Sequence, residues 1–574
     1  MGQKLLFSST ALLLAAVLLL AAGARLSPPD GEAARRYDIV VYGGSFAGCA
    51  AARTAASLAS GRSVLLVVPG TLPALGGIGT VGGQNFFDVW YWRGGLTAGG
   101  SFARWFEEAG QFYHPGRMAA ILRADLARYP NIHILWCYDV AEAVPSGGEG
   151  PLAELVLREV VPDSQGVPRW GRGAVRVRGR VYVDASEDGR LTRLAGDVTT
   201  TGRADWPQAY LEHGEGRTVA ARQQAATLMF KVRGVRAPSP EAGRLVRAGD
   251  LVFFCDHRGS WGVAGGWKAY RENPVVRDFN RRYGPRGFAL KPLNAAQEGP
   301  GSPEWWVNAL LIFNVDGRAT RRDAGTAAYP PDARPDALDA DTARLLAKEV
   351  ICDPKFLSAL RQVGGTAADG KVYGFAGAEL VRDERGEPVV GEVLYLRETV
   401  HLTREPREAG PGSEESAYAL TPSACQGAGD GPGRGADGRH YGERVGLGFY
   451  AMDINAYTFE DLRAGGEYAW PVTGRVRPDW QQKGGEPQNP VYLPYRMLVT
   501  PRVPNLLVPG YATGASSLAW AEVRVIPNLC VLGDAAGAAA ARAVLFNEEP
   551  ARFGPEQISW VQEALKRLGG RLEK

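Results

Sequence analysis

Residues 37–56 read YDIVVYGGSFAGCAAARTAA, and the run SVLLVV follows at residues 63–68. The first stretch begins with an apolar run, passes through a glycine turn and continues as an alanine-rich segment that favours helix. The second is β-branched and wholly apolar, which is typical of a parallel strand covered on both faces. Together they predict a βαβ unit of about 30 residues within an α/β fold that has a central parallel sheet.

The turn between the first strand and the helix contains Gly43, Gly44 and Gly48, with Ser45 where a dinucleotide fingerprint has its second glycine. A small residue there lets backbone N–H groups approach a pyrophosphate at the helix N-terminus. A tight βα turn without a ligand is the alternative. Val68 stands where a carboxylate would hold an adenosine ribose, which disfavours a simple NAD site.

A second glycine cluster, LGGIGTVGGQNFFD at residues 75–88, directly follows the second strand. A backbone without side chains can lie flat against a large planar ligand and offer it N–H donors. The apolar residues between these glycines favour a ligand site over a solvated loop, which is the alternative.

A third segment, NLCVLGDAAGAAAARAV at residues 528–544, predicts an apolar strand, a turn at Gly533 and Asp534, and a helix of small residues. A carboxylate at such a turn can accept hydrogen bonds from sugar-like hydroxyls, and capping of the helix is the alternative. Three glycine turns exceed what an NAD site requires. They indicate a larger cofactor that lies extended through the protein.

The segments VVYGGSFAG, LGGIGTVGG, VYVDASEDGRLTRLAG, LYLRETVHL, VGLGFYAMDIN, YLPYRMLV, PNLLVPG and RVIPNLCVLGDAAGAAAA occur in this order over most of the chain. In them the chain resembles the FAD-dependent oxidoreductase family, within the large flavoprotein group that includes fumarate reductases and para-hydroxybenzoate hydroxylase. The resemblance implies a Rossmann-like FAD-binding domain, a central parallel sheet with helices, and an inserted α+β substrate domain. It also implies an enzyme with FAD as cofactor and a small-molecule substrate.

The resemblance further implies where FAD is held. The pyrophosphate would lie on the first turn, the ribityl chain and flavin ring along the second glycine cluster, and the adenine beside Val140. Asp534 with Gly533 would hydrogen-bond the ribityl chain, and the helix starting near Ala535 would point its positive end at the flavin pyrimidine. The implied cofactor-binding residues are Gly43, Gly44, Ser45, Gly48, Gly76, Gly77, Thr80, Gly82, Val140, Ala185, Ser186, Gly533, Asp534 and Gly537.

The matching segments also contain candidates for substrate chemistry. His401 could take a hydroxyl proton while a hydride leaves for the flavin, or be a histidine satisfied in the core. Arg397 and Glu398 form a structural ion pair in the interpretation that we favour. The two remaining arginines could bind a carboxylate, a hydroxyl array or cofactor phosphates. The candidates are Arg397, Glu398, His401, Asp453, Arg496 and Arg524.

Three positions depart from the family pattern: Val400 where arginine repeats, Asn455 where histidine is common, and Arg190 in place of an acid. Because of these departures, a non-catalytic binding protein on a degenerate flavin fold is one alternative. An NAD-dependent or other Rossmann dehydrogenase is the other alternative.

The pattern along the chain predicts several parts. Residues 37–204 and 491–574 would form the FAD-binding domain, residues 205–395 the inserted substrate domain and residues 396–490 its continuation. Within the last part, residues 404–439 are rich in Gly, Ser, Pro and charge and predict a mobile loop. Further strands are expected at residues 131–136, 153–161 and 174–186.

Residues 1–24 combine a charged start, an apolar run and small residues, which predicts a secretory signal and export to the periplasm or the extracellular space. No stable membrane span is expected once this leader is cleaved. An uncleaved leader that anchors the protein is the alternative.

Composition narrows the partners. The chain has 65 Lys and Arg against 62 Asp and Glu and no long basic run, so it offers no electrostatic footprint for nucleic acid. Its six cysteines lack the spacing of zinc or iron–sulfur sites, and we expect buried free thiols at Cys49 in the first helix and Cys530 in an apolar strand. Fourteen tryptophans, together with export, favour a polyol or carbohydrate substrate. No motif indicates the electron acceptor.

Overall fold

A five-stranded parallel sheet forms the centre of the computed structural model, which describes residues 34–147, 150–206, 210–216, 218–402, 418–433, 435–463 and 487–574. β2 (Ile39–Tyr42), helix α2 (Phe46–Leu58) and β3 (Val64–Val68) make up the predicted βαβ unit, and every residue of β2 and β3 is buried. The predicted α/β class is confirmed. The strand order is β27 (Leu506–Leu507), β10 (Val181–Asp184), β2 (Ile39–Tyr42), β3 (Val64–Val68) and β6 (Ile132–Trp136).

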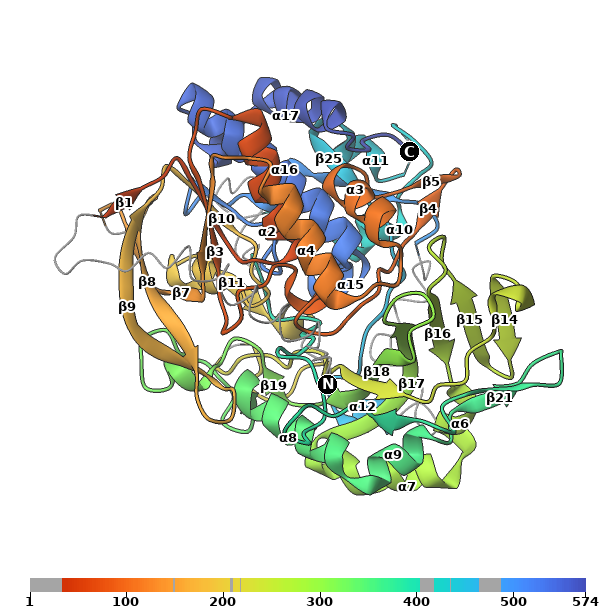
Figure 1. The fold of residues 1–574 in the computed structure, drawn as a ribbon. Coiled ribbons are helices and arrows are strands. Elements are labelled where there is room, and N and C mark those ends of the chain that lie inside the picture. The colour runs from red at the N-terminus through yellow and green to blue at the C-terminus, as the bar shows by residue number, and fades with distance from the viewer. Residues whose placement is uncertain are drawn as a thin grey trace, which may run out of the picture.

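Helices cover one face of this sheet (Figure 1). α2 packs along α16 (Ile526–Phe546), and α3 (Gly100–Ala109), α4 (Pro115–Leu126) and α17 (Pro555–Arg567) pack around the pair. A single helix, α16, spans the segment for which the sequence predicted a strand, a turn and a second helix, so that prediction was wrong.

Close contact between α2 and α16 explains why the glycines of that segment are helical. A Cβ atom on Gly533 would lie 2.3 Å from the Ala47 carbonyl oxygen, and one on Gly537 would lie 2.4 Å from that of Ala51. Residues four apart share a helix face, so these two glycines let the backbones of α2 and α16 approach. Cys530 also lies in α16, so this buried thiol is in a helix and not in the strand that the sequence predicted.

An antiparallel sheet packs on the other face of the parallel sheet. It consists of β7 (Tyr138–Pro145), β8 (Leu152–Pro162) and β9 (Pro168–Arg178), extended by β1 (Arg35–Arg36). The strands expected at residues 131–136 and 153–161 are confirmed. The single strand expected at residues 174–186 was wrong, because a turn in which the Gly179 N–H donates to the Tyr182 hydroxyl (2.7 Å) separates β9 from β10.

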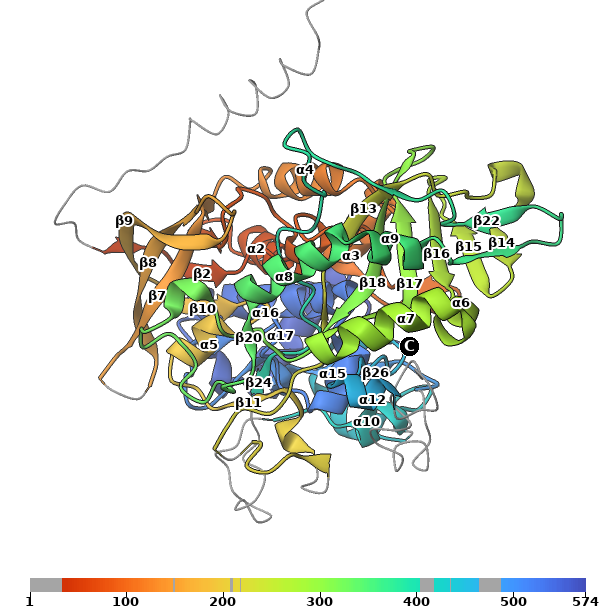
Figure 2. The same ribbon diagram turned by 90° about the horizontal axis from the view of Figure 1, so that it is seen from below.

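Residues 226–380 contain a larger antiparallel sheet with a hydrophobic core of its own. Figure 2 shows helices α7 (Pro274–Tyr283), α8 (Ala340–Cys352) and α9 (Pro354–Leu360) along one side of it, with α6 (Trp267–Glu272) beside α7. This is the α+β architecture expected for the inserted part. The order is β14 (Leu245–Ala248), β15 (Leu251–Cys255), β16 (Trp261–Gly265), β17 (Phe288–Gln297), β18 (Glu304–Ile312), β13 (Phe230–Arg233) and β23 (Glu379–Leu380), and β12 (Ala226–Thr227) also pairs with β18.

Short elements complete the fold. They are β4 (Tyr91–Trp92), β5 (Gly95–Leu96), α5 (Arg190–Leu194), β11 (Thr199–Thr201), β19 (Val315–Asp316), β20 (Leu338–Asp339), β21 (Gly364–Thr366), β22 (Val372–Gly374), β24 (Val400–Leu402), α11 (Asp437–His440), β25 (Arg444–Gly448), α12 (Phe459–Arg463), β26 (Val491–Pro494) and α15 (Ser517–Val523).

Part of the predicted loop at residues 404–439 is ordered. Residues 403–417 and 434 lie outside the described residues, but helix α10 (Pro422–Gln426) packs against α15. The loop prediction was wrong here because Leu420, Ala424 and Cys425 are buried in the main core, which compensates for the polar composition around them.

The predicted leader, residues 1–24, also lies outside the described residues. Among those that are described, α16 alone is long and apolar enough to cross a membrane, and 89% of its apolar window is buried inside the protein. All six cysteines are free thiols. Within the same described ranges, no cluster of three His, Cys, Asp or Glu side chains could hold a metal ion.

Candidate functional site

The turn from β2 into α2 is held by contacts with the segment that follows β10. Gly43 has a φ of +106°, and a Cβ atom on it would lie 2.8 Å from the Ala185 carbonyl carbon, so this position requires glycine. Ser45 caps α2: its Oγ accepts an N–H from the first helical turn at 3.3 Å and donates to the Ala185 carbonyl oxygen at 2.8 Å. The Gly76 N–H donates to the carbonyl of Gly44 at 2.7 Å. Three segments therefore meet at a helix N-terminus, where backbone N–H groups favour an anion.

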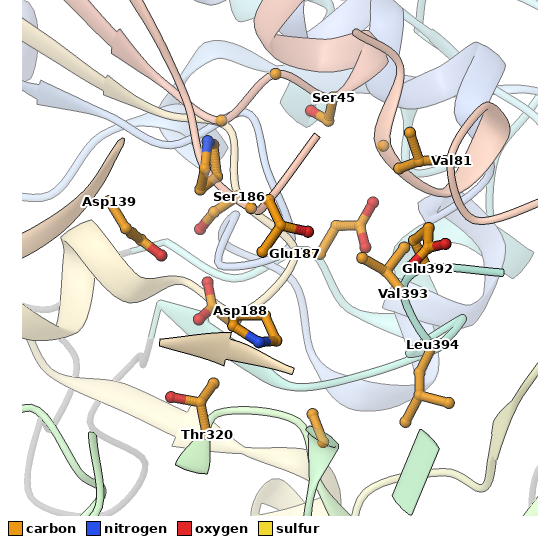
Figure 3. A pocket seen from close by; sticks show the side chains of 18 of the residues that line it. Ser45, Val81, Asp139, Ser186, Glu187, Asp188, Thr320, Glu392, Val393 and Leu394 are labelled. Carbon is orange, nitrogen blue, oxygen red and sulfur yellow. The ribbon is translucent and has the colours of Figure 1, made fainter. Parts of the chain in front are cut away.

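A cavity opens beside this turn (Figure 3). One wall consists of the β2–α2 turn, the end of β3 and residues 185–188. The opposite wall comes from residues 317–322, the first turns of α8 and residues 392–396. In Figure 3 the labelled side chains spread from Asp139 at one end, past Glu187, to Val81 and Leu394 at the other. The cavity lies between the parallel sheet and the inserted part and suits an extended ligand.

The structure brings most of the predicted cofactor-binding residues to this region. The Thr80 hydroxyl donates to the Leu75 carbonyl at 2.6 Å. Thr80, Gly48 and Gly82 are buried and do not line this cavity. Val140 is fully buried in the core below the sheet, and its neighbour Asp139 lines the cavity in its place. The predicted residues that line the cavity are Gly43, Gly44, Ser45, Gly77, Ala185 and Ser186.

Asp534 lies far inside α16, eight residues and about 12 Å from its first residue, Ile526. Its carboxylate accepts hydrogen bonds from the Thr54 hydroxyl (2.6 Å), the Ser101 N–H (2.8 Å) and the Ser101 hydroxyl (2.6 Å). The predicted position at a strand-to-helix turn was wrong, and so was the capping alternative. Asp534 ties α16 to α2 and α3.

A smaller cavity adjoins the first and shares Ser45, Ala185 and Glu187 with it. α16 begins at Ile526, whereas the sequence predicted a helix start near Ala535. Because Ile526 lines the smaller cavity, the N-terminus of α16 faces that cavity. Its lining also includes Gly76, Gln84, Tyr395 and Arg524.

Tyr395 adjoins a group of ionisable residues, which we call the charged cluster: Asp88, Lys291, Arg397, Asp453 and Arg524. Lys291, Arg397 and Arg524 are buried, whereas Asp88 and Asp453 are partly exposed. Arg524 donates to the Asp453 carboxylate (2.7 Å) and to the Tyr395 hydroxyl (2.5 Å). The Arg397 guanidinium carbon lies 4.6 Å from the centre of the Tyr395 ring. Arg524, Arg397 and Lys291 all act electrostatically on Asp88.

Two members of the charged cluster titrate near neutral pH. Burial raises the pKa of Asp88 to about 6, although the arginines act in the opposite direction. Burial, together with the charge of Arg397, lowers the pKa of Lys291 to about 7. Burial also opposes ionisation of Asp453, but Arg524 and Arg397 hold its pKa below the ordinary value. Groups with such pKa values are suited to proton transfer.

Three of the predicted catalytic residues lie elsewhere. Glu398 accepts hydrogen bonds from the Tyr457 hydroxyl (3.0 Å) and the Ser517 hydroxyl, and His401 Nδ1 lies 3.0 Å from the Tyr511 carbonyl oxygen. Both are core residues, and the predicted ion pair between Arg397 and Glu398 was wrong.

Arg496 is half exposed and lines neither cavity. Its Nε donates to the Glu443 carboxylate at 2.6 Å. The structure therefore unites Arg397, Asp453 and Arg524 but separates Glu398, His401 and Arg496 from them.

The three departures from the family pattern have structural roles. Arg190 is fully buried and donates to both carboxylate oxygens of Asp323, at 2.5 and 3.0 Å. The Asn455 amide donates to the Ala225 carbonyl at 3.0 Å. Val400 is buried in the core below the parallel sheet. None of the three lines either cavity.

Sequence reasoning missed Asp88, Lys291, Asp139 and Glu187. The single available signal was Lys291, a lone charge inside the apolar run FALKPLNAA, which a strand would bury. Nothing in the sequence indicated that five distant segments would bring the members of the charged cluster together.

A family model described as FAD dependent oxidoreductase matches residues 38–565, which is nearly all of the described chain. The protein belongs to this family of FAD-dependent oxidoreductases. Membership selects FAD over the NAD alternative and an enzyme over a non-catalytic binding protein. No curated protein matches the chain.

Several solved structures are similar to this flavoenzyme. A myxobacterial chondrochloren halogenase, described as a variant of FAD-dependent halogenases, is 15% identical over 64% of this chain and 65% of its own, with a TM-score of 0.28. p-Nitrophenol 4-monooxygenase from Pseudomonas putida is 15% identical over 50% of this chain and 69% of its own, with a TM-score of 0.25. A flavoprotein/dehydrogenase from Cytophaga hutchinsonii is 17% identical over 40% of this chain and 55% of its own, with a TM-score of 0.22. The chain thus spans just under two thirds of the halogenase, and the family assignment rests on the family model.

The residues of the two cavities fit FAD. The turn around Gly43 and Ser45 presents the N-terminus of α2 to a diphosphate, and the wall beyond it has no side chain at Gly77. The N-terminus of α16 faces the smaller cavity and favours an electron-rich group there. FAD would supply the redox chemistry when bound, and the protein supplies binding and orientation.

Proposed function

We propose that this flavoenzyme transfers a hydride between a small organic substrate and FAD, and that the substrate binds at the charged cluster. One observation carries the proposal: Tyr395 and Arg524 line the smaller cavity and also belong to or contact the charged cluster. The cluster therefore begins where the cofactor cavities end.

The ionisable residues of the cluster have distinct roles in this proposal. When a carbon–hydrogen bond next to a hydroxyl breaks as hydride, the hydroxyl proton must pass to a base. Lys291, with a pKa near 7, is a base that is partly neutral at physiological pH. Asp88 exchanges protons in the same range, whereas Asp453 stays ionised beside Arg524 and orients it.

A polyol or carbohydrate is the substrate class that we propose. Trp90 and Trp92 pack edge-on against Phe449, at centroid distances of 4.7 and 5.9 Å. Trp90 also packs against Tyr450, whose ring centre lies 5.9 Å from the guanidinium carbon of Arg524. Aromatic faces beside a polar site suit the apolar faces of sugar rings. We also propose export, which the charged, apolar and small-residue pattern of residues 1–24 supports.

The test is to purify the protein and measure the visible absorption of bound FAD, first with dithionite and then, without air, with a panel of polyols, sugars and sugar acids. We expect one panel member to bleach the flavin. Lys291→Met should slow that bleaching by about 100-fold or more while the FAD content stays unchanged, and the exposed Lys371→Met serves as control. Protein that takes up FAD but is bleached by dithionite alone would contradict the proposal.

A further inference from the structure

The guanidinium of Arg397 is buried without acceptors for two of its nitrogens. The residue is 3% exposed, and neither Nε nor Nη1 has a hydrogen-bond partner. The Tyr395 ring beneath it attracts the charge but offers no acceptor in the guanidinium plane. Because an unpaired buried charge is costly, a buried arginine normally donates to a carboxylate or a phosphate. Arg397 therefore has the hydrogen-bonding capacity for an anion.

The neighbouring carboxylates are already engaged or insufficient. Asp453 accepts from Arg524, and Glu398, next in sequence to Arg397, accepts from Tyr457 and Ser517. Within the charged cluster, the cations Lys291, Arg397 and Arg524 face two carboxylates, those of Asp88 and Asp453. While Lys291 is protonated, one positive charge stays uncompensated even when both carboxylates are ionised.

We propose that Arg397 binds a carboxylate of the substrate, so that the substrate is a sugar acid or another polyhydroxy acid. This inference rests on the proposed function and narrows its substrate class. A carboxylate matches the planar donor geometry of a guanidinium and can form two parallel hydrogen bonds with it. It also carries one negative charge, which equals the excess of the cluster, whereas a phosphate would carry about two.

The position of Arg397 suits this role. Its Tyr395 partner lines the smaller cavity, so an acid held by Arg397 lies at the cofactor end of the cluster. Lys291 interacts electrostatically with Arg397, so it belongs to the same group of charges as the bound acid. The FAD diphosphate has a separate anion site at the N-terminus of α2.

Equilibrium titration of the FAD-loaded protein tests the inference without turnover. Three acids and their neutral counterparts are used: acetate and acetamide, benzoate and benzamide, gluconate and sorbitol. The measured quantity is the change in the visible spectrum of bound FAD. We expect at least one acid to bind about tenfold or more tightly than its neutral counterpart. If no acid perturbs the spectrum up to about 50 mM, the inference is overturned, even if a neutral substrate bleaches the flavin and the proposed function holds.

Variants separate Arg397 from the rest of the cluster. Arg397→Gln should weaken binding of the acid about 10- to 100-fold, as expected for a lost charge-assisted hydrogen bond, without changing the affinity for the neutral counterpart or the FAD content. Arg397→Lys should retain part of the acid affinity, and Arg281→Gln, on the exposed face of α7, should retain all of it. Loss of FAD from Arg397→Gln would assign the guanidinium to the cofactor and overturn the inference.

Discussion

Two glycine-containing segments of this chain look alike in sequence and differ in structure. GGSFAG at residues 43–48 is a strand-to-helix turn at the cofactor cavity, and GDAAG at residues 533–537 is the middle of a helix. In the first, Gly43 adopts a left-handed φ and packs against the Ala185 backbone. In the second, the glycines admit the backbone of α2. Glycine spacing alone does not distinguish a ligand turn from a helix-packing seam.

Replacing Asp534 tests whether the second glycine segment serves helix packing, and we expect a large loss of stability. Asp534→Ala leaves the Thr54 hydroxyl and the two Ser101 donors without their acceptor in the core, so the free energy of unfolding of the apoprotein should fall by about 3 kcal/mol. The affinity for FAD should stay within about twofold of wild type. Urea denaturation and FAD titration measure the two quantities, and Asp534→Asn should give a smaller loss. A variant that folds normally but loses FAD would restore the cofactor role that the sequence predicted.

Replacing Gly43 should weaken FAD binding, in contrast to replacing Asp534, which should lower stability. An alanine there must adopt a φ of +106° and place Cβ 2.8 Å from the Ala185 backbone, so the turn has to move. We expect the affinity for FAD to fall about 100-fold, or about 2.7 kcal/mol. Gly325→Ala is the matched control, because Gly325 has a φ of +77° with open space around it and lines neither cavity. Equal FAD affinities for the two variants would show that the turn does not hold the cofactor.

Glu187 makes the cofactor end pH-dependent. Burial, and to a lesser degree Asp188, raises the pKa of Glu187 to about 7 from an ordinary value near 4.5. The neutral carboxyl is therefore favoured in the folded protein, and its stabilising contribution is complete below pH 4.5 and is lost as the pH rises through about 7.

Glu187 lines both cavities, so its ionised carboxylate would repel the diphosphate of bound FAD, and FAD should bind more weakly above pH 7. Glu187→Gln should flatten this dependence, which FAD titrations at pH values from about 5 to 9 would measure. An identical pH profile in the variant would assign the dependence to another group.

Ser45 gives the smallest expected effect. Ser45→Ala removes the cap of α2 and should lower the free energy of unfolding by about 1 kcal/mol. Asn273 caps α7 in the same way, far from the cavity, so Asn273→Ala should cost a similar amount of stability without changing FAD affinity. If only Ser45→Ala also weakens FAD binding, measured by titration, the cap of α2 belongs to the cofactor site. Equal FAD affinities would limit Ser45 to helix capping.

The sequence was sufficient to predict the βαβ unit and the first turn, because strand, glycine turn and helix are contiguous and their patterns are local. It failed at α16, where the four-residue spacing of Gly533 and Gly537 was the available sign of a helix face. It also could not show which of the catalytic candidates lie together. Arg397, Asp453 and Arg524 come near Asp88 and Lys291 only through the tertiary packing of segments that are far apart in the sequence, and no local pattern records such proximity.

Titration of the apoprotein with FAD measures cofactor binding without a known substrate. We expect saturation at one FAD per chain, with an intact Gly43 turn required and Asp534 dispensable. Folded apoprotein that binds no FAD, or binds it equally well after Gly43→Ala, would show that the cavity beside the Gly43 turn is not the FAD site.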